Sequence, residues 1–124
     1  STAEFEDPNT VKVVVDLADY ALYFSRESVP SRKKGVSLVP MRKQICIIPF
    51  NRDYLLRFNA LHETPLEVIE SVDMMRVLEN GDKVKMIFTK ERSFGVDTPE
   101  DLAFVEREMR HDSLMPQYLG KLPC

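Results

Sequence analysis

Hydrophobic and polar positions along the chain predict several strands. Residues 11–16 are rich in β-branched side chains and residues 20–24 in aromatic and aliphatic ones, and the short gap between them suits a hairpin loop. Residues 45–50 form the longest apolar stretch, and its unbroken hydrophobicity predicts a third strand over residues 44–50, buried on both faces at the centre of an α/β sheet. Residues 84–88 place apolar side chains at alternate positions, which predicts a further strand with one core-facing side.

Helix signals occupy the middle of the chain. Residues 52–58 predict a short helix. The T-P-L-E sequence at 64–67 combines an N-cap threonine, a proline at the first helical position and a glutamate that completes a capping box. A helix is therefore expected from residue 65 to about residue 78, closed by Asn80-Gly81. Its polar positions change sides along its length, which predicts a break near Ser71, where a second short helix is capped.

A second capping box starts the last helix. Thr98 is the predicted N-cap, proline takes the first helical position, and Asp101 completes the box. Three apolar residues at helical spacing are expected to line one face of this helix: Leu102, Val105 and Met109.

The element order β-β-β-α-α-α-β-α predicts an α/β fold, with a mixed sheet and flanking helices. We expect residues 1–10 to be a connecting segment, residues 11–110 the folded domain, and residues 111–124 a tail. The sequence contains no dinucleotide-binding or P-loop glycine pattern. A bound nucleotide would therefore need a phosphate cradle from outside this chain.

Composition narrows the function classes. The 124 residues carry 17 basic and 20 acidic side chains, a net charge of −3, which argues against the basic surface of a nucleic-acid-binding domain. No apolar run approaches the roughly 18 residues of a membrane span. Cys46 and Cys124 are far apart and form neither a disulfide framework nor a metal-binding pattern, which favours a reducing cytoplasm.

Two charged residues are candidates for chemistry. Asp97 directly precedes a helix N-cap, where an anion stays ionised and is placed to bind Mg²⁺; the alternative is that it only hydrogen-bonds to the start of the helix. Arg26 follows the second predicted strand, and its guanidinium suits a carboxylate or a phosphate. The alternative for Arg26 is a surface ion pair with Glu27 or Asp19. No residue is assigned a direct catalytic role.

Four segments, taken together and in order, resemble the C-terminal half of the bacterial 3-deoxy-manno-octulosonate cytidylyltransferases (CMP-Kdo synthetases). They are Y-A-L-Y-F-S-R at 20–26, T-P-L-E at 64–67, R-V-L-E-N-G at 76–81 and G-V-D-T-P-E-D-L at 95–102. The resemblance covers nearly the whole chain except the tail. It implies a Rossmann-like nucleotidyltransferase fold and a cytoplasmic, homodimeric, Mg²⁺-dependent enzyme. Such an enzyme joins CTP to a 3-deoxy-ulosonic acid sugar for lipopolysaccharide synthesis, releasing pyrophosphate.

The resemblance also implies roles for single residues. Asp97 matches the family's metal-binding aspartate, and Arg26 matches an arginine that contacts the sugar acid. The family's N-terminal half, with its CTP-binding loop and its other metal-binding aspartate, has no counterpart in these 124 residues. We therefore expect the chain alone to be inactive and the missing half to be its partner.

The sequence departs from the family at positions that face the sugar. Gln44 stands where a histidine is usual, Ile48 where a tyrosine is usual, and Asp73-Met74 where Glu-Gln is usual. These changes predict a modified sugar, such as the 8-amino-8-deoxy analogue, because the shorter Asp73 leaves room for an ammonium group and places a charge opposite it.

Other functions remain open from the sequence. One is a non-catalytic α/β module for dimerisation or sugar binding. Another is an enzyme like the CMP-sialate synthetases, which share the chemistry but fit these motifs less well.

Overall fold

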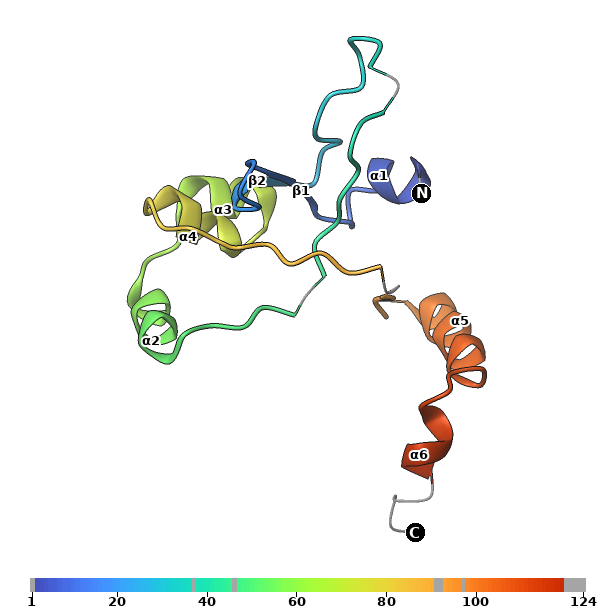
Figure 1. Cartoon of the computed structure of the whole chain (residues 1–124). Helices are drawn as coiled ribbons and strands as arrows, with labels where there is room; N and C mark the ends of the chain where they lie inside the picture. Colours follow the sequence, from blue (N-terminus) through green and yellow to red (C-terminus); the bar gives the residue numbers. More distant parts are fainter. Residues whose placement is uncertain (1, 37, 46, 91–92, 97, 120–124) are drawn as a thin grey trace. The chain divides into compact units, whose positions relative to one another are not determined.

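The computed structural model describes residues 2–36, 38–45, 47–90, 93–96 and 98–119, and the chain divides into two compact units, 1–89 and 90–124. Figure 1 shows a small hairpin beside a pair of short helices in the first unit, and helices alone in the second. The elements in chain order are α1 (Thr2–Glu6), β1 (Lys12–Val15), β2 (Ala21–Ser25), α2 (Arg52–Ala60), α3 (Pro65–Glu70), α4 (Met74–Glu79), α5 (Pro99–Met109) and α6 (Met115–Leu119).

The hairpin predicted from the two strand-like segments is confirmed. β1 and β2 pair antiparallel, with Val13 opposite Phe24, and both side chains are buried. The Asp16 carboxylate closes the turn by accepting hydrogen bonds from the backbone N–H groups of Ala18 (2.8 Å) and Tyr20 (2.9 Å). An aspartate in this position replaces backbone partners that a tight turn leaves unpaired.

The predicted central strand at residues 44–50 is wrong. Lys43 forms one antiparallel bridge with Lys12, and the Gln44 N–H donates to the carbonyl of Val11 at 2.9 Å. Beyond this point the described residues form no ladder, and Ile47 is 82% exposed. A continuous apolar run makes a central strand only where strands flank it on both sides. Among the described residues, this apolar run pairs with a single strand, β1, and only at its start.

The predicted strand at residues 84–88 is also reduced to one bridge. The N–H of Ala21 donates to the carbonyl of Val84 (2.9 Å), and Lys85 bridges Tyr20. The ammonium of Lys85 lies 5.0 Å from the centre of the Tyr20 ring, a cation–π contact. Ile87 is 84% exposed, so the pairing ends before the segment does.

The helix break predicted near Ser71 is confirmed. Ser71 has φ of 52°, in the left-handed region, and ends α3, while Asp73 is the residue at the N-cap of α4. Ser71 therefore closes the first helix and does not cap the second. The predicted end at Asn80-Gly81 is also confirmed, because Gly81 has φ of +77° and its N–H donates to the carbonyl of Leu78 at 3.0 Å.

The core of the first unit lies between the hairpin, α2 and the α3–α4 pair. The predicted helix α2 is confirmed; the Asn51 side chain caps it by accepting from the N–H of Asp53. The Phe50 ring lies 5.4 Å from the ring of Phe58 and extends the core beyond α2. The buried cluster consists of Val13, Ala21, Phe24, Phe58, Val72, Met74, Met75 and Val77.

The second unit begins its main helix as the sequence predicts. In the capping box, the Thr98 Oγ1 accepts from the Asp101 N–H (3.1 Å), and the Thr98 N–H donates to the Asp101 carboxylate (3.0 Å). The expected apolar face of α5 is not buried, because Leu102 and Met109 are both exposed. Phe94 and Phe104 instead meet edge to face, with ring centres 5.0 Å apart.

Both ends of the chain contain helices that the sequence pattern did not predict. α1 lies in the expected connecting segment and buries Phe5, and α6 lies in the expected tail. Hydrophobic periodicity is weak in such short helices, and five residues are too few to reveal it. None of the helices in the described ranges is long and apolar enough to cross a membrane.

A bidentate ion pair joins α3 to α4. The Arg76 guanidinium donates to both carboxylate oxygens of the buried Glu67, at 2.5 and 2.7 Å. Arg76 also donates to the carbonyl of Leu61 and lies 4.7 Å from the Phe58 ring centre, so the same side chain reaches α2. The hydrogen bonds from Arg76 hold the pKa of Glu67 below its ordinary value, although burial opposes this.

A carboxylate from α4 caps the start of α3. Glu79 accepts hydrogen bonds from the N–H groups of Leu66 (3.1 Å) and Glu67 (3.2 Å), which have no partner within the helix. Glu67 completes the cap by accepting from the N–H of Thr64 at 3.2 Å. The two short helices therefore stabilise each other at their ends.

The Glu67–Arg76 pair predicts a pH dependence. Because the pKa of Glu67 is lowered from 4.5, the pair stabilises the fold above that pH and loses its contribution as the pH falls through the lower, folded-state pKa. Circular dichroism melts should show Tm falling below about pH 5. Glu67→Gln should lower Tm at neutral pH and flatten this fall. Glu63→Gln, at an exposed neighbouring carboxylate, is the control; equal pH profiles of the two variants would contradict the assignment.

A glycine substitution tests the end of α4. A Cβ added at Gly81 meets no atom within 4 Å, so the expected loss comes only from its φ of +77°. Gly81→Ala should destabilise the fold by about 1 kcal/mol in urea unfolding. Gly35 has the same φ and equally open surroundings, but lies in the long segment between β2 and α2, which can relax. If Gly35→Ala costs as much, the helix end is not the cause.

Candidate functional site

The predicted sugar-acid residue, Arg26, lies where β2 ends against the C-terminus of α3. Its Nε donates to the carbonyl of Glu70 (2.8 Å) and its Nη2 to the carbonyl of Ser71 (2.9 Å). Its Nη1 donates to the carbonyl of Pro8 at 3.1 Å and to that of Asn9 at 3.4 Å. The guanidinium therefore caps α3 and holds the turn before β1.

The local alternative for Arg26, a surface ion pair, is not what the structure has. Among the described residues, no ion pair joins Arg26 to Glu27 or to Asp19, and Asp19 lies instead 3.9 Å from the ammonium of Lys85. Arginine has five N–H donors, and four contacts leave at least one N–H for a ligand.

The Glu70 side chain, on α3, binds the end of β2 through hydrogen bonds. Its carboxylate accepts hydrogen bonds from the Tyr23 hydroxyl (2.9 Å), the Ser25 hydroxyl (3.1 Å) and the Arg26 N–H (2.9 Å). Burial, together with the hydrogen bond to Glu70, raises the pKa of Tyr23, so this phenol stays a donor. No local pattern pointed to Glu70, because its partners are some 45 residues away in the sequence.

Two predicted sugar-facing residues lie on the segment after the β1 bridge. The Oε1 atom of Gln44 is buried and has no hydrogen-bond partner among the described residues. A buried acceptor without a partner costs about 1–3 kcal/mol, so this oxygen is suited to a donor from a ligand or from solvent. Ile48 packs against the core and is only partly exposed.

The structure places the two residues of the other predicted pair, Asp73 and Met74, in different surroundings. Asp73 is exposed at the N-cap of α4, and its carboxylate makes no capping hydrogen bond. Met74 is 2% exposed and belongs to the core. Within the described ranges, no hydrogen bond or ion pair links Arg26 to Gln44 or to Asp73. Their assembly into one sugar site stays a prediction.

The predicted metal ligand, Asp97, lies outside the described residues. In the part of the chain that the structure describes, no group of three or more His, Cys, Asp or Glu side chains could hold a metal ion. The role of Asp97 as a metal ligand therefore stays a prediction.

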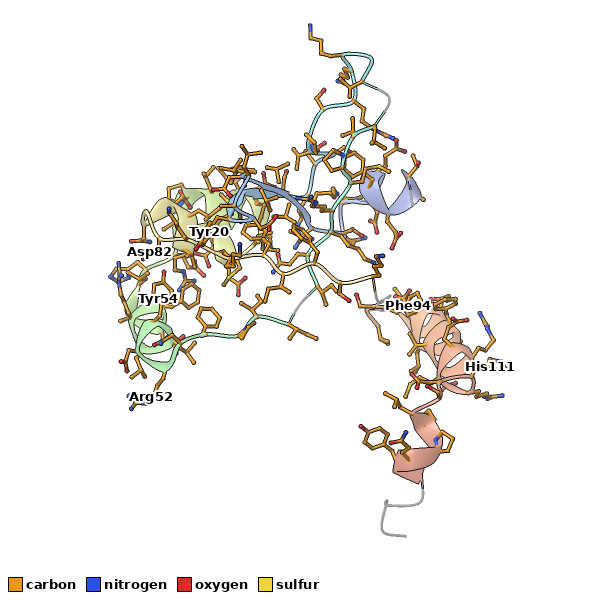
Figure 2. All side chains as sticks on the ribbon, in the orientation of Figure 1. Tyr20, Arg52, Tyr54, Asp82, Phe94 and His111 are labelled. Carbon is orange, nitrogen blue, oxygen red and sulfur yellow. The ribbon has the colours of Figure 1, made fainter. Side chains whose placement is uncertain are left out.

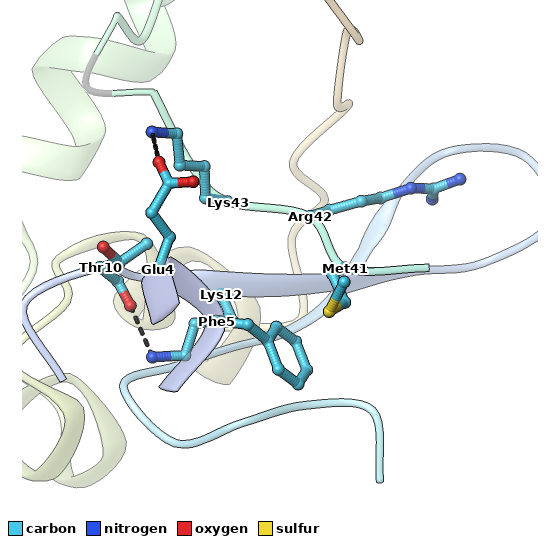
Figure 3. A pocket seen from close by; sticks show the side chains of 7 residues that line it. All are labelled: Glu4, Phe5, Thr10, Lys12, Met41, Arg42 and Lys43. Atoms are coloured by element: carbon cyan, nitrogen blue, oxygen red, sulfur yellow. Dashed lines mark hydrogen bonds and ion pairs between the residues drawn. The ribbon is translucent and has the colours of Figure 1, made fainter. Parts of the chain in front are cut away.

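A pocket of about 190 Å³ has none of the predicted site residues in its lining (Figure 3). Burial lowers the pKa of Lys12, whose ammonium donates to the carbonyls of Asp7, Thr10 and Arg26. The two other cations of the lining also have partners: Lys43 pairs with Glu4 at 2.7 Å, and the Arg42 guanidinium lies 4.1 Å from the centre of the Phe88 ring. The lining residues are Glu4, Phe5, Thr10, Lys12, Met41, Arg42 and Lys43.

A second polar network fixes α2 to the turn after α4 (Figure 2). Asp82 accepts from the Tyr54 hydroxyl at 2.9 Å and pairs with Arg57 at 3.0 Å. Burial and this hydrogen bond raise the pKa of Tyr54. The network holds the core helices together and contains none of the predicted site residues.

Known proteins resemble this chain in both sequence and structure. The family model described as cytidylyltransferase matches residues 1–91. A 3-deoxy-manno-octulosonate cytidylyltransferase from Fusobacterium nucleatum is 40% identical over 111 residues, covering 90% of this chain and 45% of that protein. The protein of the same name from Thermodesulfovibrio yellowstonii is 46% identical over 109 residues, covering 84% of this chain and 43% of that protein.

A solved structure adds the comparison in three dimensions. It is a CMP:2-keto-3-deoxy-manno-octonic acid synthetase complexed with CTP, with a TM-score of 0.82 and 33% sequence identity. The match covers 90% of this chain and 46% of that one, and this chain spans less than half the length of each relative named. The expected nucleotidyltransferase type of α/β fold is confirmed. On the family match over residues 1–91, the chain belongs to the cytidylyltransferase family.

Proposed function

We propose that this chain is the C-terminal, sugar-binding portion of an enzyme that activates a 3-deoxy-ulosonic acid sugar with CTP. The products are the CMP-sugar and pyrophosphate, for lipopolysaccharide synthesis. The observation that carries this proposal is the TM-score of 0.82 to a synthetase complexed with CTP, over 90% of this chain. The remaining portion supplies the CTP site, and we propose a homodimer in the cytoplasm.

The proposed reaction depends on position and charge. The anomeric hydroxyl of the sugar attacks the α-phosphate in line, and pyrophosphate leaves. Cationic groups offset the negative charge that develops on the phosphate. In this chain the Arg26 guanidinium, with an N–H to spare, is the proposed partner of the sugar carboxylate. Asp97 is the proposed contribution to a divalent metal site, with Mg²⁺ as the ion.

Pyrophosphate release tests this function. The full-length protein that the gene encodes should release pyrophosphate from CTP when 3-deoxy-manno-octulosonate and Mg²⁺ are present, and the 124-residue chain alone should not. Asp97→Asn in the full-length protein should lower kcat by roughly 100-fold, because a carboxylate that offsets metal charge becomes neutral. Asp112→Asn, the same change at an exposed position, should keep full activity. A folded full-length protein without CTP turnover would remove the proposed function.

We further propose that the sugar carries an amino group, as in the 8-amino-8-deoxy analogue. The exposed Asp73 carboxylate, free of a helix-cap bond, supports this, because it is available to an ammonium group. The buried, unpartnered Oε1 of Gln44 offers a further acceptor. Met74 lies in the core and contributes packing in place of a polar contact.

A competition assay decides between the two sugars. With equal amounts of plain and 8-amino-8-deoxy octulosonate, the full-length protein should prefer the amino sugar by about tenfold in kcat/KM, the effect of one close charge pair. Asp73→Asn should remove most of this preference. A clear preference of the unaltered protein for the plain sugar would rule out the amino-sugar proposal and leave the cytidylyltransferase proposal intact.

A further inference from the structure

Arg26 and Glu70, which are 44 positions apart, bind each other in both directions. The backbone N–H of Arg26 donates to the Glu70 carboxylate at 2.9 Å, and the Nε of Arg26 donates to the Glu70 carbonyl at 2.8 Å. The side chain of each residue therefore holds the backbone of the other. We call this pair the Arg26–Glu70 clasp.

Among the described residues, the Glu70 carboxylate binds only β2 and the residue that follows it. Besides the Arg26 N–H, Glu70 accepts from the hydroxyls of Tyr23 and Ser25. These contacts occupy both carboxylate oxygens, and an ionised carboxylate can accept all of them because it has about four lone-pair sites. Glu70 thus sets where β2 ends relative to α3.

The guanidinium side of the clasp depends on the left-handed backbone conformation of Ser71, which ends α3. This residue adopts φ of 52°, a conformation that costs a non-glycine residue about 1 kcal/mol. Its carbonyl and that of Glu70 both accept from the same guanidinium, at 2.9 and 2.8 Å. A strained residue persists where its surroundings determine it, and here the surroundings are the contacts of Arg26.

We propose that Glu70 is a positioning residue that fixes the Arg26 guanidinium for the carboxylate of the sugar acid. This inference rests on the proposed function, since it is there that Arg26 contacts the sugar. Glu70 does not touch the substrate itself. It holds the backbone on one side of Arg26 while its carbonyl holds the side chain, so the remaining N–H of the guanidinium points in one direction.

Glu70→Gln in the full-length protein tests the proposal. Glutamine has one acceptor oxygen and an NH₂ group, so it cannot accept from all three donors, the two hydroxyls of β2 and the N–H of Arg26. The expected result is a rise of roughly tenfold to 100-fold in the KM for the sugar acid, the effect of a displaced binding group. The KM for CTP and kcat should stay within about twofold of the unaltered protein, because Glu70 contacts only β2 and Arg26 among the described residues and no residue proposed for the metal site.

Glu79→Gln is the matched control. Glu79 is also a carboxylate that accepts backbone N–H groups, but those belong to Leu66 and Glu67, at the other end of α3. This variant should lower Tm without raising the KM for the sugar acid. If Glu70→Gln lowers Tm and leaves this KM unchanged, Glu70 is a stabilising residue only and the proposal is overturned.

Hydrogen exchange of the Arg26 Nε–H, followed by NMR, supplies a readout that needs no turnover. Exchange should be slow in the unaltered full-length protein, faster in Glu70→Gln and unchanged in Glu79→Gln. Unchanged exchange in Glu70→Gln overturns the proposal. If the unaltered protein is folded but releases no pyrophosphate, the proposed function fails, and the exchange rates alone decide whether Glu70 positions Arg26.

Discussion

The bidentate pair between Glu67 and Arg76 is the contact on which the rest of the first unit depends. α3 and α4 each have six residues, too few to be stable helices in water without tertiary contacts. The buried Glu67 carboxylate joins them through Arg76, which also reaches the end of α2 at the Leu61 carbonyl. With the two helices held together, the reversal at Ser71 has one geometry, and the carbonyls at the end of α3 meet Arg26. The clasp between Arg26 and Glu70 is thus built on the pair beside it.

The same arrangement connects the fold to the proposed chemistry. The sugar carboxylate needs a cation whose position does not change between turnovers, and a guanidinium held by carbonyls meets this need because only its unused N–H groups are available. The exposed Ile47 and Ile87 lie on segments with one bridge each to the hairpin. The two segments therefore extend the pairing of the hairpin by one bridge on each side, at Lys12 of β1 and at Tyr20 just before β2.

Local signals predicted those elements whose partners are close in the sequence. The Thr98–Asp101 capping box, the hairpin and the end of α4 at Gly81 are confirmed, because each forms within a few residues. The strand predicted at 44–50 failed for the opposite reason: its hydrophobicity indicates burial, but a strand exists only where neighbours provide hydrogen-bond partners. At the candidate site, the sequence pointed to Arg26 but not to Glu70, because no local pattern links residues 44 positions apart.

The sequence by itself determined the starts of α3 and α5, the end of α4, the hairpin and the family resemblance, since these depend on the types of neighbouring residues. Only the tertiary structure decided which side chains hold which carbonyls. It placed Met74 in the core and left Asp73 beside it exposed, although the two are adjacent in the chain. It also turned the Arg26 guanidinium toward the end of α3. The physical reason is that a long side chain binds whichever carbonyl the packing of the core places within its reach. That packing is set by the whole core and not by the local sequence.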